Sequence, residues 1–206
     1  MITSLIILLP VLVGLLLWHQ LPEQIPVHFN SEGVADSYQS KLWGVTFIYL
    51  VIFACHWFAA IITSVDPRRR NISSKIYRLV LWICPVISVF VGVTIYGTAL
   101  NWPWVNINFM ANLLLGVIFI VIGNYLPKCR QNYTVGIKVP WTLASEANWD
   151  ATHRMAGKLW VAGGVLILLL AIQPWIPAFP ISLVLILAVT FIPMIYSFVY
   201  YLRNKK

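Results

Sequence analysis

The sequence predicts an all-α polytopic membrane protein with six transmembrane helices, one long extracellular loop and one long cytoplasmic loop. Three observations lead to this fold class: the composition, the spacing of the apolar segments and the side on which the basic residues gather. Of the 206 residues, 60% are apolar and 10% are charged, whereas a soluble domain has roughly 45–50% and about 25%. A soluble protein of this length could not bury so much apolar surface, but a bilayer accommodates it.

Six segments are apolar enough to be candidate spans, because a membrane-spanning helix needs about 20 such residues. The first is slightly short, and it lacks the basic start and cleavage site of a removable signal peptide. The fifth is long enough only if its helix begins before Leu159, and Pro174, Pro177 and Pro180 predict a turn between the last two spans. The six candidates are residues 2–18, 42–65, 76–100, 107–126, 159–172 and 180–202.

The basic residues predict the orientation of these spans. With six spans, thirteen of the fourteen Lys and Arg residues lie on one side of the membrane, in segments 66–78, 127–158 and 203–206. Only Lys41 lies on the other side. Because basic loops stay in the cytoplasm, we expect both termini to be cytoplasmic. The net charge of +8 then orients the chain, and we expect no direct contact with nucleic acid.

The domain organisation follows from this topology. We expect one membrane domain over residues 1–206. The extracellular loop is 19–41 and the cytoplasmic loop is 127–158. The three cysteines are scattered without a CxxC motif, so they predict no disulfide framework. We expect no cofactor, and a bound metal stays open.

The extracellular loop carries side chains that could bind a partner. His28, Glu32 and Asp36 are possible metal ligands, but this spacing without a second histidine is a weak metal pattern. Alternatively, His28 and Asp36 pair with Lys41 or with backbone groups and fold the loop. Residues 31–33 resemble a turn that ends in Gly33. We favour a binding surface that uses His28, Gly33, Asp36 and Lys41.

The cytoplasmic loop ends in a segment with helical spacing. Ser145 predicts the start of a helix on which Glu146, Asp150 and His153 follow at i, i+4 and i+7. That spacing places the three side chains on one face. Two carboxylates and a histidine can hold a metal or carry out acid–base chemistry. The sequence therefore leaves open a metal-dependent enzyme within the membrane or at its surface.

A non-catalytic interpretation of the same helix is favoured. Trp149 and Thr152 lie on the side opposite the acids. Acids in the first turns of a helix are stabilised by its dipole, and Arg154 can pair with Asp150 one turn earlier. This pattern is typical of a solvated face with a structural or recognition role.

His56 is the ionisable side chain nearest the middle of a predicted span. Ionisable residues inside a membrane are candidates for function, so a small transporter with His56 on its path is a further alternative. The other interpretation is a neutral imidazole that is hydrogen-bonded to a neighbouring helix.

Each long loop carries an ordered set of residues that forms a motif. The outer loop contains Ile25-Pro26-x-His28-Phe29-Asn30-x-x-Gly33-x-x-Asp36 and ends in Ser40-Lys41. The inner loop contains Asn132, Gly136-Ile137-Lys138, Pro140-Trp141-Thr142-Leu143, Trp149, Thr152-His153-Arg154 and Gly157. Both loops resemble those of the SdpI-type bacterial immunity proteins. The outer motif is similar to an uncharacterised N-terminal module often paired with this family, and the inner motif to the family signature, except that Lys138 replaces an expected Arg and Val139 an expected Thr. The resemblance implies a bacterial plasma-membrane protein with an N-terminal module at residues 1–65 and a second module at 107–202.

The resemblance implies a six-span protein that protects a cell against a secreted peptide toxin. In the best-known system, such a protein also draws a transcriptional autorepressor to the membrane. The expected partners are therefore the lipid bilayer, a secreted toxic peptide and, where one exists, a cytoplasmic repressor. Inside, the expected binding residues are Asn132, Gly136, Lys138, Trp141, Thr142, Glu146, Trp149, Asp150, Thr152, His153 and Arg154.

Overall fold

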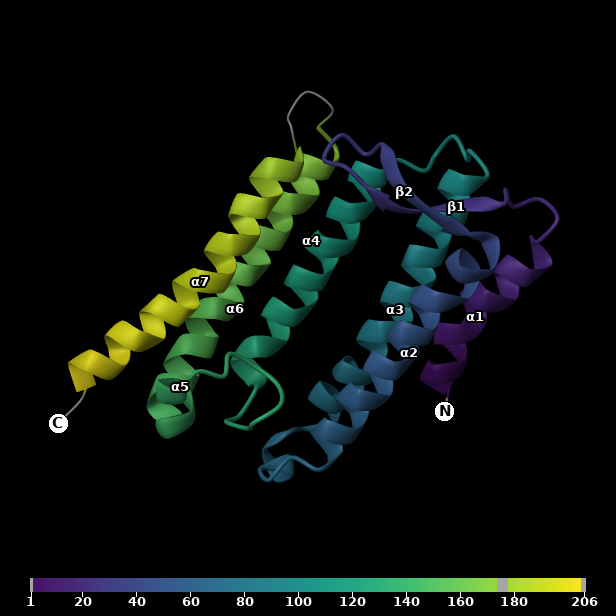
Figure 1. Cartoon of the computed structure of the whole chain (residues 1–206). Coiled ribbons are helices and arrows are strands. Elements are labelled where there is room, and N and C mark those ends of the chain that lie inside the picture. The colour runs from purple at the N-terminus through teal and green to yellow at the C-terminus, as the bar shows by residue number, and fades with distance from the viewer. Residues whose placement is uncertain (1, 174–177, 205–206) are drawn as a thin grey trace. The chain divides into compact units, whose positions relative to one another are not determined.

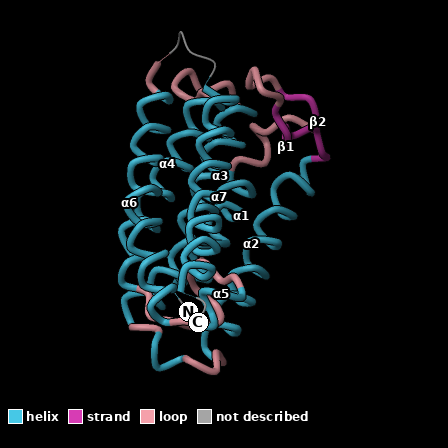
Figure 2. The backbone as a smooth tube through the Cα atoms, turned by 90° about the vertical axis from the view of Figure 1, so that its left-hand side faces the viewer, coloured by secondary structure: helices cyan, strands magenta, loops and turns pink. Residues whose placement is uncertain are grey.

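The computed structural model describes residues 2–173 and 178–204. Within them the chain is mainly helical, with one short β-hairpin (Figures 1 and 2). The long helices and the two strands are α1 (Ile2–Leu16), β1 (Gln24–Phe29), β2 (Ala35–Ser40), α2 (Lys41–Ser64), α3 (Ser74–Ala99), α4 (Ile107–Tyr125), α6 (Glu146–Ala171) and α7 (Ala178–Asn204). The short helical elements are η1 (Arg69–Asn71), η2 (Leu126–Lys128) and α5 (Pro140–Ala144).

Five of the described helices are long and apolar enough to cross a membrane. They are α2, α3, α4 with η2, α6 and α7. The 15 residues of α1 are also apolar, but they extend only about 22 Å, less than the roughly 30 Å hydrocarbon core of a bilayer. The membrane fold class is therefore confirmed, while the count of six spans and the location of the termini stay predictions.

The chain divides into two compact units. The first comprises Met1–Ile61 and Arg78–Leu114, and the second comprises Ile62–Tyr77 and Leu115–Lys206. Helices α3 and α4 each contribute residues to both units. The single domain and the modules at 1–65 and 107–202 stay predictions.

The first unit has an apolar core that is supplemented by side chain–backbone hydrogen bonds between its helices. The Tyr96 hydroxyl donates to the carbonyl of Pro10 over 2.8 Å, and the Ser88 hydroxyl donates to the carbonyl of Ile7 over 2.7 Å. Such bonds satisfy polar groups that lipid cannot solvate. The buried core consists of Leu21, Ile25, Val45, Tyr49, Ile95 and Tyr96.

The outer loop contains an antiparallel hairpin, which the all-α prediction left out. The pairing of β1 with β2 shifts register between Pro26 and Phe29, as in a β-bulge. The predicted turn is confirmed, because Gly33 adopts a φ of +80°. Ile25 on β1 is fully buried, and a Cβ on Gly44 of α2 would approach its side chain to 2.6 Å. This close packing fixes the hairpin at the start of α2.

In the second unit, α6 and α7 run side by side (Figure 1). Helix α6 begins at Glu146, with the Ser145 hydroxyl accepting from the Asn148 N–H as an N-cap, so this predicted start is confirmed. The helix continues without interruption to Ala171 and therefore meets the length condition for the fifth span. Trp160 on α6 donates its indole N–H to the carbonyl of Val189 on α7 over 2.8 Å.

The predicted turn before α7 falls mostly where the structure gives no description. Pro174 and Pro177 lie outside the described residues, whereas Pro180 lies in the first turn of α7. A proline is tolerated there because the first N–H groups of a helix have no intrahelical acceptor. The sixth apolar segment thus begins two residues earlier than predicted.

Candidate functional site

Most of the predicted inner-loop residues fold into one structure in the second unit. We call it the loop cap and define it as residues 66–72 and 126–153. It joins the segment between α2 and α3, the segment between α4 and α5, helix α5 itself and the first two turns of α6. Helix α5 and the loop after α4 are visible beside the start of α6 in Figure 1.

His153 holds the middle of the loop cap. Its Nε2 accepts the backbone N–H of Ile137 over 2.9 Å, and its Nδ1 lies 2.8 Å from the carbonyl of Trp149. One nitrogen must accept and the other donate, which requires the neutral ring with its proton on Nδ1. The ring is only 1% exposed. His153 is therefore fixed as a structural residue with both nitrogens occupied.

Gly136 lies directly against this histidine. Its φ of +121° belongs to the left-handed region, which residues with a side chain rarely adopt. A Cβ at this position would also lie 2.5 Å from His153 Nε2 and 3.0 Å from the Trp149 ring. Both the backbone angle and the lack of space require glycine here.

Trp149 anchors the cap in its apolar cluster. Its side chain is fully buried, and its ring stacks on His153 with the centroids 4.0 Å apart. The indole N–H donates to the carbonyl of Cys129 over 2.7 Å. Burial raises the pKa of the Cys129 thiol to about 11, so this cysteine stays protonated at neutral pH. The buried cluster consists of Ile72, Ile76, Cys129 and Trp149.

Asn132 shapes the loop that precedes Gly136. Its Oδ1 accepts the N–H groups of Thr134 and Val135 over 2.9 and 2.6 Å. Its Nδ2 donates to the carbonyls of Arg130 and Val135 over 2.8 and 3.0 Å. These bonds make an Asx-type turn, and they leave no free polar group on Asn132 with which to bind a partner directly.

Trp141 and Thr142 fix helix α5. The Thr142 hydroxyl accepts the Val139 N–H over 3.1 Å and lies 2.9 Å from the carbonyl of Ile137. The Trp141 indole donates to the Ser197 hydroxyl on α7 over 2.5 Å, and its ring packs on Phe198. These contacts attach the cap to α7.

The predicted acid–acid–histidine face is wrong. Glu146 and Asp150 are exposed, whereas His153 is buried against Trp149, on the side that the sequence assigned to the opposite face. Thr152 is buried as well, and its hydroxyl donates to Asn148 Oδ1 over 3.0 Å. His153 follows both Trp149 and Asp150 by about one turn, so helical spacing could not choose between them.

Two basic residues of the inner prediction lie at the surface. Lys138 is exposed and donates to the carbonyl of Thr134 over 2.8 Å, a bond that does not require the expected arginine. Arg154 is exposed too, and the described part of the chain shows no ion pair between it and Asp150. The predicted pairing of these two residues is thus not formed.

Asp66 has a structural role that the sequence analysis did not predict. This carboxylate is 5% exposed. Its Oδ2 accepts the Tyr133 N–H over 3.0 Å and the Thr134 hydroxyl over 2.8 Å, and its Oδ1 accepts the Arg68 N–H over 2.7 Å. The one available signal was its position, because only Pro67 separates this acid from a run of three arginines.

Gln131 completes the connection between the two segments of the cap. Its Nε2 donates to the carbonyls of Thr142 and Leu143 over 2.8 and 2.9 Å, while its Oε1 accepts from the guanidinium of Arg68. Asn71 donates to the Gln131 carbonyl over 2.7 Å. The segment between α2 and α3 is therefore bonded to the segment between α4 and α5.

The outer candidate residues lie on the hairpin. His28 Nδ1 and Asp36 Oδ1 are 2.6 Å apart, and both side chains are exposed. Lys41 donates to Glu23 over 2.8 Å and to the carbonyl of Trp18 over 3.2 Å. His28 thus pairs with Asp36, whereas we predicted that both would pair with Lys41 or with backbone groups, and Lys41 pairs with Glu23 instead. Among residues 2–173 and 178–204, no group of three or more His, Cys, Asp or Glu side chains is placed to hold a metal.

The tip of the hairpin is closed by the side chain of Asn30. Its Oδ1 accepts the N–H groups of Glu32 and Val34, each over 3.0 Å. A Cβ on Gly33 would lie 3.3 Å from the Asn108 side chain at the start of α4. Gly33 is therefore required by the conformation of the turn and by its close packing against Asn108.

His56 is buried in α2 and contacts α1. Its Nε2 lies 3.3 Å from the Thr3 hydroxyl, which agrees with an imidazole bonded to a neighbouring helix. Within the described residues, Nδ1 has no hydrogen-bond partner. The transporter alternative stays an untested prediction.

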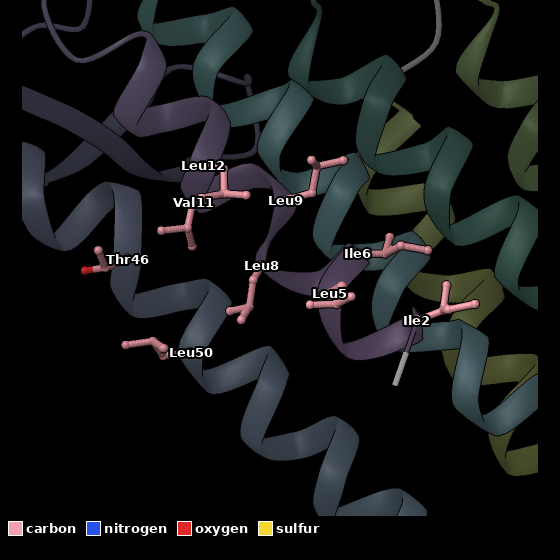
Figure 3. A pocket seen from close by; sticks show the side chains of 9 residues that line it. All are labelled: Ile2, Leu5, Ile6, Leu8, Leu9, Val11, Leu12, Thr46 and Leu50. Carbon is pink, nitrogen blue, oxygen red and sulfur yellow. The ribbon is translucent and has the colours of Figure 1, made fainter.

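An apolar groove of about 620 Å³ runs along α1 and α2 (Figure 3). It is lined by α1 residues between Ile2 and Leu12 and by Thr46 and Leu50 of α2. The Thr46 hydroxyl donates to the carbonyl of Leu42 over 2.7 Å, so it is already paired. The groove offers apolar contact area rather than polar recognition, as expected where lipid chains meet a protein.

Comparison with known proteins shows which protein families these segments resemble. Residues 128–201, which contain most of the loop cap, α6 and most of α7, match the SdpI/YfhL protein family. This part of the chain is similar to members of that family. Residues 5–53, which contain most of α1, the hairpin and about half of α2, match a domain of unknown function named DUF1648. The family prediction made from the two loops is thus confirmed.

The likeness extends beyond the family signature. The chain is 25% identical to the immunity protein SdpI of Bacillus subtilis (strain 168) over 205 residues, which cover 97% of this chain and 94% of that protein. No solved structure matches the chain. The relationship to an SdpI-family immunity protein, together with the apolar helices, supports a membrane immunity function.

Proposed function

We propose that this protein protects a bacterium against a secreted toxic peptide that it meets at the outer hairpin. The observation that carries the proposal is the likeness to an immunity protein over 97% of the chain. Because that likeness includes both the outer and the inner loops, it favours a shared function over a shared membrane fold alone.

The hairpin has the properties of a peptide-binding surface. Its first strand is anchored through buried Ile25, whereas almost every residue of β2 is exposed. A two-stranded sheet has free edges, and an extended peptide can add to such an edge through backbone hydrogen bonds. The exposed pair His28 and Asp36, together with exposed Tyr38, supplies side chains that can distinguish one peptide from another.

The loop cap supports a second part of the proposal, the binding of a cytoplasmic repressor. The buried residues of the signature hold the cap in one shape, and the exposed residues Arg70, Arg130 and Lys138 make its surface basic. A repressor with an acidic patch would be attracted to such a surface. The buried residues of the signature then act by positioning, and the surface cations make the contact.

The experiment is a survival assay with a sensitive bacterium that expresses the protein and is challenged with an SdpI-type toxic peptide. We expect the wild type to protect, and we expect His28→Ala and Asp36→Ala to reduce protection at least tenfold in the dose tolerated. Glu32→Ala is the matched control, because it removes an exposed carboxylate from the same hairpin. Membrane expression of each variant is measured in parallel.

Failure of the well-expressed wild type to protect against any SdpI-type peptide would contradict the proposal. Equal loss in Glu32→Ala would contradict the assignment of the site to the His28–Asp36 pair. Repressor binding is tested by co-expressing a fluorescent repressor from the same genome. It should move to the membrane with the wild type and stay dispersed with an Arg70→Gln/Arg130→Gln/Lys138→Gln variant.

A further inference from the structure

A groove of about 730 Å³ lies in the second unit, where α6, α7 and η2 meet. It differs from the apolar groove of Figure 3 in carrying two cations, Arg154 and Lys158. These residues are one turn apart on α6, so their side chains lie on the same face of the helix. Its apolar lining includes Pro127, Met155, Leu159 and the ring of Tyr196.

The two cations have no anionic partner in the described part of the chain. Arg154 and Lys158 are both exposed, and neither takes part in either of the ion pairs found among the described residues. Asp150, one turn before Arg154, does not pair with it. Two adjacent cations of this kind favour a ligand with a compact negative charge, such as a phosphate group.

The position of the pair on the helix indicates where such a phosphate would come from. Helix α6 is polar from Glu146 to Lys158, and its continuous apolar run begins at Leu159. Arg154 and Lys158 therefore lie at the boundary between polar and apolar surface, which is the depth of lipid phosphates in a bilayer. Long basic side chains reach headgroups from this depth.

The apolar part of the groove distinguishes a lipid from a free anion. Met155, Leu159 and Pro127 offer contact area that a free phosphate cannot use, but that the glycerol backbone and the first methylenes of an acyl chain would cover. Tyr196 is half-exposed on α7, and its amphipathic ring suits the interface. Basic pockets between membrane helices bind anionic headgroups on the same principle.

We propose that this groove binds the headgroup of an anionic glycerophospholipid, with Arg154 and Lys158 on the phosphate and Met155 and Leu159 against the acyl chain. The proposal is independent of toxin binding, which is placed on the first unit. It gives Arg154, the exposed end of the signature Thr152-His153-Arg154, a role that the buried residues beside it do not share.

The test uses the full-length protein, purified in a neutral detergent and freed of lipid. Phosphatidylglycerol, phosphatidylcholine, inorganic phosphate and glycerol 3-phosphate are each titrated while the thermal unfolding midpoint is recorded. Of these four compounds, only phosphatidylglycerol should raise the unfolding midpoint of the wild type. An Arg154→Gln/Lys158→Gln variant should need about 25-fold more lipid for the same shift, because a basic residue near the surface contributes roughly a factor of five to anionic-lipid binding.

The matched control is Arg70→Gln/Lys75→Gln, which removes the same charge from exposed positions outside the groove. It should respond as the wild type does. Equal loss in this control, or an equal response of the wild type to phosphatidylcholine or to inorganic phosphate, would overturn the proposal.

A second measurement needs no variant: photoactivatable phosphatidylglycerol should label the α6 segment around Met155 and the α7 segment around Tyr196. Labelling spread evenly over all the apolar helices would overturn the assignment.

Discussion

At the residue scale, the loop cap rests on buried polar groups that each make several hydrogen bonds. Asp66, Gln131 and Asn132 together bond to seven other residues of the cap, over 2.6–3.0 Å and through a further contact with the guanidinium of Arg68. Leaving one such group without a partner costs about 1–3 kcal/mol. The family signature at these positions therefore describes folding more than direct contact with a ligand.

Gly136→Ala tests this interpretation. We expect the variant to lower the free energy of unfolding by about 1–3 kcal/mol, because the left-handed backbone is strained by a Cβ and His153 must shift. The measurement is the thermal midpoint of purified protein in detergent. Lys138→Ala, two residues along in the same loop, is the control and should stay within about 0.5 kcal/mol of the wild type. Equal stability of Gly136→Ala and wild type would contradict the requirement for glycine.

At the element scale, the hairpin depends on its attachment to helix α2. A two-stranded hairpin alone is only marginally stable in water, and β2 is exposed along nearly its whole length. The stabilising contacts come from Leu21 and Ile25 in the core of the first unit, and from the Lys41–Glu23 pair at the base of the hairpin. The exposed face of the hairpin is thus held by buried Leu21 and Ile25 and by the ion pair at its base.

Ile25→Ala should release the hairpin while leaving the helices in place. Removing a fully buried isoleucine side chain costs about 2–5 kcal/mol, and here the loss falls on one locally anchored element. We expect cleavage within residues 30–36 by an added protease to become at least tenfold faster, with unchanged membrane expression. Val34→Ala, at an exposed position near the tip, is the control and should be cleaved at the wild-type rate. Protection of Ile25→Ala from the protease would contradict this anchoring.

At the scale of the whole molecule, contacts inside the second unit bear on the topology. The segment between α2 and α3 is hydrogen-bonded to the segment between α4 and α5 through Asp66, Asn71 and Gln131. Both segments must then lie on the same side of a membrane, which requires an even number of crossings between them. Helices α3 and α4 supply two. The basic residues at both segments agree with a cytoplasmic location.

Labelling from the two sides of the membrane tests this topology. In a Cys55→Ser/Cys84→Ser background, Cys129 stays as it is, because its raised pKa leaves only about one thiol in a thousand ionised at pH 8. Ser31→Cys should then react with an impermeant maleimide in intact cells. Arg70→Cys should react only after the cells are opened. Labelling of both positions in intact cells would contradict the predicted orientation.

The sequence by itself determined the features that depend on local composition. Apolar runs defined the membrane segments, the N-cap Ser145 and the turn at Gly33 were correctly placed, and the two loop motifs indicated the family. These signals are local because hydrophobic length, helix capping and turn conformation depend on neighbouring residues in the chain. The sequence also identified His28 and Asp36 as candidate residues, whereas their pairing with each other was seen only in the structure.

Only the tertiary structure decided how distant residues meet. The hairpin is stabilised because Ile25 packs in a buried position against α2. Strand pairing of this kind depends on tertiary context more than on intrinsic strand propensity. Asp66 bonds to Thr134 across 68 positions of sequence, a distance at which no local pattern gives information. His153 lies near both Trp149 and Asp150 on its helix, and the loop at Gly136 and Ile137 decided that its ring turns inward. The sequence suggested His153 as a candidate for acid–base chemistry or metal binding. Its buried hydrogen bonds instead give it a structural role.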